Sequence, residues 1–136
     1  MFGIVVATHG EFGIEMVATL QMILGSTEGI QAIALLPSES LEGFKTKMEE
    51  TLKKVDSKNE GALVLVDMIG GTPFNVAMLT AQTHRLQVVT GVNLPMLIKL
   101  ATGQDESDLE TLAVETQKVA REGVVTSVEL LKGKKV

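Results

Sequence analysis

Apolar residues along this chain follow two patterns that alternate. Short and almost uninterrupted apolar runs occupy residues 2–7, 30–36, 62–66 and 86–90. Runs of this length without polar alternation are typical of central strands that are covered on both faces. Between the runs, apolar residues recur at steps of three or four, which is the spacing of amphipathic helices. The pattern therefore predicts strands and helices in alternation.

The clearest expected helix covers residues 41–55. One stripe of this helix is apolar, and lysines and glutamates cover the opposite side. The stripe consists of Leu41, Phe44, Met48, Leu52 and Val55. Further helices are expected over residues 13–24, 94–100, from 72 to about 82 and from about 107 to 122.

Several expected helices carry recognisable end signals. Gly25 and Gly123 stand where a glycine commonly ends a helix. The candidate N-terminal caps are Ser38 or Ser40, Thr72 followed by Pro73, and Ser107 with Glu110 in a capping box. These signals predict where the expected helices begin and end between the strands.

Strands and helices that alternate at this spacing predict an α/β fold. We expect an open, mostly parallel sheet of four strands with helices on both faces. Residues 124–131 alternate weakly between apolar and polar side chains and predict an additional C-terminal edge strand, antiparallel to the rest. The length of 136 residues, without repeats or a linker, predicts a single domain over residues 1–136.

Composition excludes several kinds of function. The chain has no cysteine, which rules out thiol chemistry, disulfides and cysteine zinc sites, and two histidines without a spaced acid cluster predict no metal site. A net charge of -5, only two arginines and no Trp or Tyr argue against nucleic-acid binding and against an arginine clamp for phosphate. The start of the chain has no basic segment followed by a long apolar one, so we expect a cytoplasmic protein.

The stretch VLVDMIGGTPFNVA, residues 64–77, contains the strongest candidate site. Asp67 follows a buried strand, Gly71 completes a glycine pair, and Thr72 opens the next expected helix. Free backbone amides at such a helix N-terminus suit a phosphoryl group. His9 ends the first strand, and Ser38 and Asn93 end two others. If the first and third strands are neighbours, His9 and Asp67 face each other.

This pairing would make His9 a nucleophile. An acceptor on one ring nitrogen fixes the tautomer and offsets the positive charge that develops as the other nitrogen attacks. Asp67 is the natural acceptor, and the donors for the phosphoryl oxygens would come from Gly71, Thr72 and Asn75. His84 lies in a polar turn and is interpreted as structural.

The motif T-H-G at Thr8 to Gly10, combined with D-x-x-G-G-T-P-F-N from Asp67 to Asn75, resembles enzyme IIA of the mannose-type phosphotransferase system. The resemblance covers essentially the whole chain. It implies that His9 accepts a phosphoryl group from the carrier protein HPr on the ring nitrogen farther from the backbone, while Asp67 holds the nearer one. No cofactor is implied.

The resemblance also implies partners. His9 would pass its phosphoryl group to a IIB subunit, which serves the membrane subunits IIC and IID of a sugar transporter. Family members are typically homodimers that can exchange their last strand. The chain departs from some members by Met68-Ile69, where an aromatic residue can stand, and by Thr72 in place of serine. Lacking a fused IIB domain, it is expected to be a separate subunit.

Two other functions remain open from the sequence. A regulatory or dihydroxyacetone-kinase phosphodonor domain of the same fold would also be phosphorylated on His9. A non-enzymatic module could use the same loops only to bind an anion. A histidine phosphatase is disfavoured because Thr8 stands where that site needs arginine, and no P-loop motif is present.

Overall fold

The computed structural model describes residues 1–104 and 108–133. The strands are β1 (Gly3–His9), β2 (Ile30–Leu35), β3 (Ala62–Val66) and β4 (Leu86–Val89). The helices of the described residues are α1 (Phe12–Leu24), α2 (Leu41–Val55), α3 (Gly71–Thr80), α4 (Leu94–Thr102), α5 (Leu109–Glu122) and α6 (Ser127–Leu131). All four strands lie where the apolar runs predict them.

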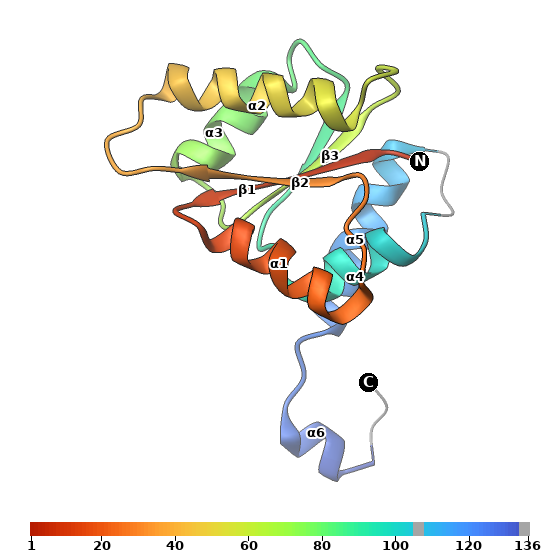
Figure 1. Cartoon of the computed structure of the whole chain (residues 1–136). Coiled ribbons are helices and arrows are strands. Elements are labelled where there is room, and N and C mark those ends of the chain that lie inside the picture. Colours follow the sequence, from red (N-terminus) through yellow and green to blue (C-terminus); the bar gives the residue numbers. More distant parts are fainter. Residues whose placement is uncertain (105–107, 134–136) are drawn as a thin grey trace.

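The four strands form one parallel sheet in the order β2-β1-β3-β4. Figure 1 shows this sheet nearly edge-on, with α2 and α3 on one side and α1, α4 and α5 on the other. The predicted α/β fold with helices on both faces is therefore confirmed. Since β1 pairs with β3 and with β2, the chain reverses its direction of strand addition at β1, which is where ligands bind in open α/β sheets.

Each face of the sheet has its own apolar core. On one face, α2 contributes the fully buried Phe44 and Met48, as the predicted apolar stripe requires, and α3 contributes Val76. On the other face, Leu20 of α1 and Leu112 of α5 pack with side chains of α4. Because β1 and β3 are buried between the two cores, their carboxyl ends hold a fixed relative position.

Helix ends agree with the capping signals in part. Gly25 adopts a left-handed conformation, with φ at 81°, at the end of α1, and Ser40 rather than Ser38 caps α2 by accepting from the Gly43 N–H. The expected capping box at Ser107 lies outside the described residues. Within them, the Asp108 side chain caps α5 by accepting from the Thr111 N–H at 3.1 Å.

The prediction that Thr72 caps α3 is wrong. The helix begins at Gly71, with Gly70 in the capping position and no side-chain cap. Gly70 and Gly71 have φ angles of 79° and 82°, a region that glycine adopts without steric cost. The glycine pair therefore turns the chain into the helix before Thr72 is reached.

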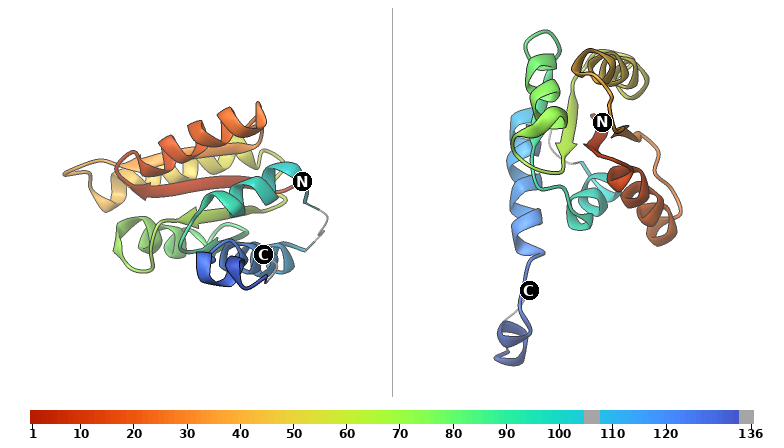
Figure 2. Two further views of the ribbon diagram at one scale, coloured as in Figure 1. Left: turned by 90° about the horizontal axis from the view of Figure 1, so that it is seen from below. Right: turned by 90° about the vertical axis from the view of Figure 1, so that its left-hand side faces the viewer.

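The predicted C-terminal edge strand is also wrong. Residues 127–131 form the short helix α6, which begins when the Thr126 hydroxyl accepts from the Glu129 N–H at 3.2 Å. This T-x-x-E capping pattern favours a helical turn over the weak alternation of the same residues. Figures 1 and 2 show α6 lying away from the sheet and its covering helices. None of the described helices is long and apolar enough to cross a membrane.

Candidate active site

His9 is the last residue of β1 and stands opposite Leu35 of β2. The next peptide turns away from the strand, because Gly10 has a φ of 56° and its N–H donates to the Leu35 carbonyl at 2.8 Å. The His9 side chain projects from this turn and is 48% exposed. A fixed backbone thus carries an imidazole that a partner can reach.

Asp67 receives His9 as the sequence predicts. One carboxylate oxygen, Oδ2, accepts from the His9 backbone N–H at 2.9 Å and lies 2.8 Å from the ring nitrogen Nδ1. The other oxygen, Oδ1, accepts from the Met68 N–H at 3.0 Å. Because the same oxygen binds the backbone and the ring of His9, it fixes the rotamer of the imidazole as well as its tautomer, with the proton on Nδ1.

Burial and hydrogen bonding act in opposite directions on the Asp67 carboxyl, which is 14% exposed. Burial raises its pKa, whereas the hydrogen bonds from the backbone and ring of His9, together with electrostatic attraction to His9, lower it. The net result is a pKa below the ordinary value. Asp67 is therefore ionised at neutral pH and can balance a positive charge that develops on His9.

The lowered pKa of Asp67 predicts a loss of stability in acid. A carboxyl whose pKa is lower in the folded chain stabilises it above the unfolded pKa, about 3.9, and this contribution disappears as the pH falls through the folded pKa. The wild type should therefore lose stability relative to Asp67→Asn as the pH is lowered below about 4. Urea unfolding of both proteins between neutral and acid pH measures this, and a difference that stays constant would contradict it.

The N-terminus of α3 lies against the other side of the imidazole. A methyl group on Gly71 would stand 3.0 Å from Cε1 and 3.2 Å from Nε2 of His9, so only glycine lets the helix approach this closely. No side chain caps α3, so the N–H groups of its first turn remain available as donors at this end of the helix. Pro73 adds no donor, because it has no N–H.

Thr72 and Asn75 share the start of α3 with Gly71. Thr72 is half-buried, and Asn75 is exposed one helical turn after Gly71, on the same face of the helix. The structure therefore brings His9, Asp67 and Gly71 together at the carboxyl ends of β1 and β3, and Thr72 and Asn75 lie in the first turns of the helix that begins there. An anion at Nε2 of His9 would meet the positive end of the helix dipole.

Thr8 has a role in the site that sequence reasoning missed. Its side chain is fully buried, and its hydroxyl accepts from the Gly13 N–H in the first turn of α1 at 2.8 Å. This bond spans His9 and ties the end of β1 to the start of α1. A polar residue at the end of an otherwise apolar strand was the available signal.

We expect Thr8→Val to destabilise the fold by about 1–3 kcal/mol, because it leaves the buried Gly13 N–H without an acceptor. Valine keeps the shape of threonine, so the loss reports the hydroxyl. Urea unfolding of the variant checks this value. Thr8→Ser, which keeps the acceptor but removes a methyl group, is the matched control, and an unchanged stability of Thr8→Val would contradict the role of the hydroxyl.

Exposed apolar side chains border His9 on three segments. We call them the apolar collar: Phe12, Leu36, Met68 and Ile69. Each is between 51% and 72% exposed. They belong to the start of α1, the loop after β2 and the turn between β3 and α3. Apolar side chains gathered at a site in this way mark a surface for another protein.

Other residues at the strand ends have different uses. Asn93 caps α4 by accepting from the Met96 N–H and donates to the Ala120 carbonyl, so it serves the fold. Ser38 lies in the loop after β2. His84 lies in the turn after α3, where Nδ1 of its ring is 3.1 Å from the Thr83 hydroxyl. Among the residues that the structure describes, no group of three metal-ligating side chains occurs.

The comparison with known families agrees with this site. The family model described as the PTS system fructose IIA component, EIIA-man, matches residues 3–117, a range that includes His9 and the whole Asp67 to Asn75 motif. The chain belongs to this family of IIA components. The family resemblance that the two motifs predict is therefore confirmed.

Similar IIA proteins cover most of the chain. It is 30% identical over 113 residues to the "PTS system fructose-specific EIIA component" of Bacillus subtilis, which spans 82% of this chain and 77% of the relative. A solved structure of a mannose/sorbose specific IIA subunit from Enterococcus faecalis has a TM-score of 0.83 at 32% identity, covering 92% of this chain and 93% of the other. The four-stranded IIA fold is thus shared.

A longer relative is also similar. The "PTS system mannose-specific EIIAB component" of Escherichia coli is 37% identical over 126 residues, which cover 89% of this chain. The match covers 38% of that relative's length. What the rest of the longer protein does is therefore no property of the chain described here.

Proposed function

We propose that this chain is a phosphoryl carrier of a bacterial sugar phosphotransferase system, in which His9 accepts a phosphoryl group from phospho-HPr and passes it to a IIB subunit. The observation that carries the proposal is that the His9 imidazole is contacted on both of its sides. Asp67 binds Nδ1, and Gly71 at the uncapped start of α3 lies against Nε2. Membership of the IIA family supports the same role.

In the proposed reaction, the lone pair of His9 Nε2 attacks the phosphorus of the donor phosphohistidine. The new Nε2–P bond forms as the N–P bond of the donor breaks, and the electron pair of that bond returns to the donor imidazole. Positive charge grows on the His9 ring, where Asp67 offsets it at 2.8 Å. Transfer to IIB is the same displacement, with His9 as the leaving group.

The phosphoryl oxygens would be held without cationic side chains. The amides of Gly71 and Thr72, the Thr72 hydroxyl and the Asn75 amide are the proposed donors, assisted by the dipole of α3. Neutral donors of this kind stabilise the group less than an arginine clamp does. Weaker retention suits a carrier, because the phosphoryl group has to leave again for IIB.

The apolar collar favours a carrier over a module that only binds an anion. A small anion needs no exposed apolar side chains around its site, whereas a phosphoprotein donor does. The same surface would serve HPr and IIB in turn, because both must reach Nε2 of His9. The chain would act in the cytoplasm. It would reach the membrane subunits IIC and IID only indirectly, through the phosphorylated IIB subunit.

The proposed assembly is a homodimer. Residues 124–131 lie away from the rest of the chain, as Figure 2 shows. The exposed apolar side chains of this segment are Val124, Val125, Val128, Leu130 and Leu131. A second copy is the simplest cover for such a segment. Sedimentation equilibrium distinguishes a dimer from a monomer, and a monomer at all accessible concentrations would contradict this part of the proposal.

The carrier function is tested by incubating the chain with phosphoenolpyruvate, enzyme I and HPr. We expect an acid-labile phosphate adduct, which passes to a mannose-type IIB subunit that is added after the phosphoryl donors have been removed. Omitting HPr is the matched control, because enzyme I should not reach His9 directly. The absence of an adduct in the complete mixture would refute the carrier and favour the anion-binding module.

A further inference from the structure

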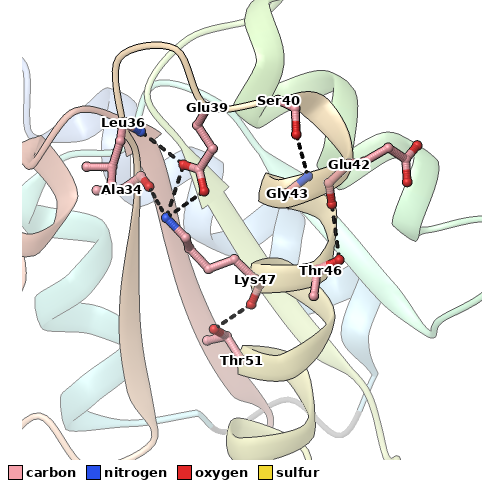
Figure 3. A network of polar contacts seen from close by, with 9 residues as sticks. All are labelled: Ala34, Leu36, Glu39, Ser40, Glu42, Gly43, Thr46, Lys47 and Thr51. Carbon is pink, nitrogen blue, oxygen red and sulfur yellow. Dashed lines mark hydrogen bonds and ion pairs between the residues drawn. The ribbon is translucent and has the colours of Figure 1, made fainter.

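The loop between β2 and α2, residues 36–40, is held by a network of polar contacts that Figure 3 shows. Lys47 of α2 reaches across the loop, and its Nζ lies 3.0 Å from Glu39 Oε2 and 3.1 Å from Oε1. The same ammonium donates to the Ala34 carbonyl at 2.8 Å. Glu39 Oε1 also accepts from the Leu36 N–H at 3.0 Å. The ion pair thus binds the backbone at the end of β2 and at the first residue of the loop.

This pair is better ordered than an ordinary surface ion pair. The Glu39 side chain is 17% exposed and that of Lys47 is 32% exposed. Nζ of Lys47 also lies 5.8 Å from the ring centre of the buried Phe44. The Leu36 N–H and the Lys47 ammonium hold the pKa of Glu39 below its usual value, so the pair stays charged at neutral pH. Its contacts therefore fix the geometry of the loop.

The backbone of the loop confirms that its shape is imposed. Ser38 has a φ of 67°, a left-handed conformation that residues other than glycine rarely adopt. The Glu39 N–H donates to the Leu36 carbonyl and closes the turn at 3.1 Å. Conformations of this kind persist only where surrounding contacts determine them, and they gather at functional sites.

The residue that this network holds most directly is Leu36 of the apolar collar. Its neighbour Leu35 stands opposite His9 and accepts from the Gly10 N–H, so Leu36 lies at the edge of the site. A donor protein must cover this edge, because phosphoryl transfer requires its phosphohistidine within bonding reach of His9. An apolar contact on a backbone already in position needs no ordering when the donor binds.

We propose that Glu39 and Lys47 are positioning residues, which hold Leu36 as a preformed contact for the phosphoryl-donor protein. The inference rests on the carrier function proposed above and adds a specificity-determining contact to it. Two other roles of the network compete with this one. Glu39 could touch the donor itself, or the ion pair could serve only the stability of the fold.

Steady-state transfer from phospho-HPr to the full chain separates these roles. We expect Leu36→Ser to raise KM about fivefold with kcat changed by less than about twofold, since a contact used equally in binding and in transfer affects KM alone. Glu39→Ala should raise KM about threefold by releasing the loop. Met22→Ser, at a residue 87% exposed at the far end of α1, is the matched control and should leave KM unchanged.

A double-mutant cycle tests whether Glu39 acts through Leu36. If it does, Glu39→Ala should add little to KM in a chain that already carries Leu36→Ser. Lys47→Arg should retain the wild-type KM, because arginine can keep both contacts, whereas Lys47→Met should resemble Glu39→Ala.

The outcomes are distinguishable. Fully additive effects in the cycle would show direct contact between Glu39 and the donor and would overturn the positioning role. An unchanged KM in all loop variants, with a wild type that is phosphorylated normally, would overturn the inference and leave the carrier function intact. A wild type that phospho-HPr does not phosphorylate would overturn both.

Discussion

Replacement of His9 by glutamine should abolish phosphorylation by phospho-HPr while leaving the fold intact. Asp67 on one side and the start of α3 on the other support the His9 ring and leave Nε2 as its nucleophilic atom. The lone pair of the glutamine amide nitrogen is delocalised into the carbonyl and does not attack, so we expect the rate to fall by about a thousandfold or more. Mass spectrometry of the intact chain after incubation with phosphoenolpyruvate, enzyme I and HPr measures the adduct.

The fold should survive this change because the His9 side chain is about half exposed. Circular dichroism and the midpoint of urea unfolding provide the check. His84→Gln is the matched control, since it removes the other histidine from a polar turn, and it should retain full labelling. Labelling that persists in His9→Gln, or that disappears in His84→Gln, would refute the assignment of the nucleophile.

Asp67→Asn should slow phosphoryl transfer by about a hundredfold. The carboxylate accepts three hydrogen bonds, two from His9 at Oδ2 and one from Met68 at Oδ1. An asparagine side chain has only one acceptor atom, so it cannot satisfy all three. If the asparagine oxygen takes the position of Oδ2, its NH₂ group faces the Met68 N–H, so two donors oppose each other. In the reverse orientation, the NH₂ group faces the backbone N–H and the ring N–H of His9.

The substitution also removes the negative charge that offsets the growing charge on the His9 ring. Rapid-quench measurement of transfer from phospho-HPr gives the rate, and nitrogen NMR of the free chain reports the His9 tautomer. We expect a mixture of tautomers in Asp67→Asn. A variant with the wild-type rate and a single tautomer would show that Asp67 is not the orienting group. Asp108→Asn, which changes a helix cap instead, should leave the rate unaltered.

Patterns within one element were sufficient to predict most of the fold and the central pair of the site. The four strands are short apolar runs, and a parallel sheet brings their carboxyl ends to one edge. His9 and Asp67 therefore follow from strand position together with the pairing of β1 and β3. Periodicity also predicted the buried side of α2 at Phe44, Met48 and Leu52, whereas Leu41 at the start of the predicted stripe is exposed.

Features that depend on competition between local signals were predicted wrongly. Residues 124–131 alternate weakly enough to suggest a strand, but Thr126 caps a helical turn through the Glu129 N–H. Thr72 is a favourable capping residue by type, yet Gly70 and Gly71 begin the helix earlier through positive φ angles. In each case a shorter-range interaction decided the structure.

Contacts between elements other than the pairing of His9 with Asp67 at the strand ends could not be predicted from the sequence. The ion pair between Glu39 and Lys47 joins a loop to a helix at a separation of eight residues, which no rule of helical spacing covers. The hydrogen bond from the Gly13 N–H of α1 to the Thr8 hydroxyl is a second contact of this kind. Such contacts require the relative placement of elements, which the packing of both cores determines.

The two edges of the sheet are protected differently. On the outer side of β2, the ammonium of Lys47 occupies the Ala34 carbonyl, and a charge at a strand edge discourages another strand from adding there. At the other edge, no strand of the described residues pairs beyond β4. If two chains paired through the edges of their sheets, each would use only its β4 edge. Pairing of this kind would therefore stop at two copies and would not continue into a fibre.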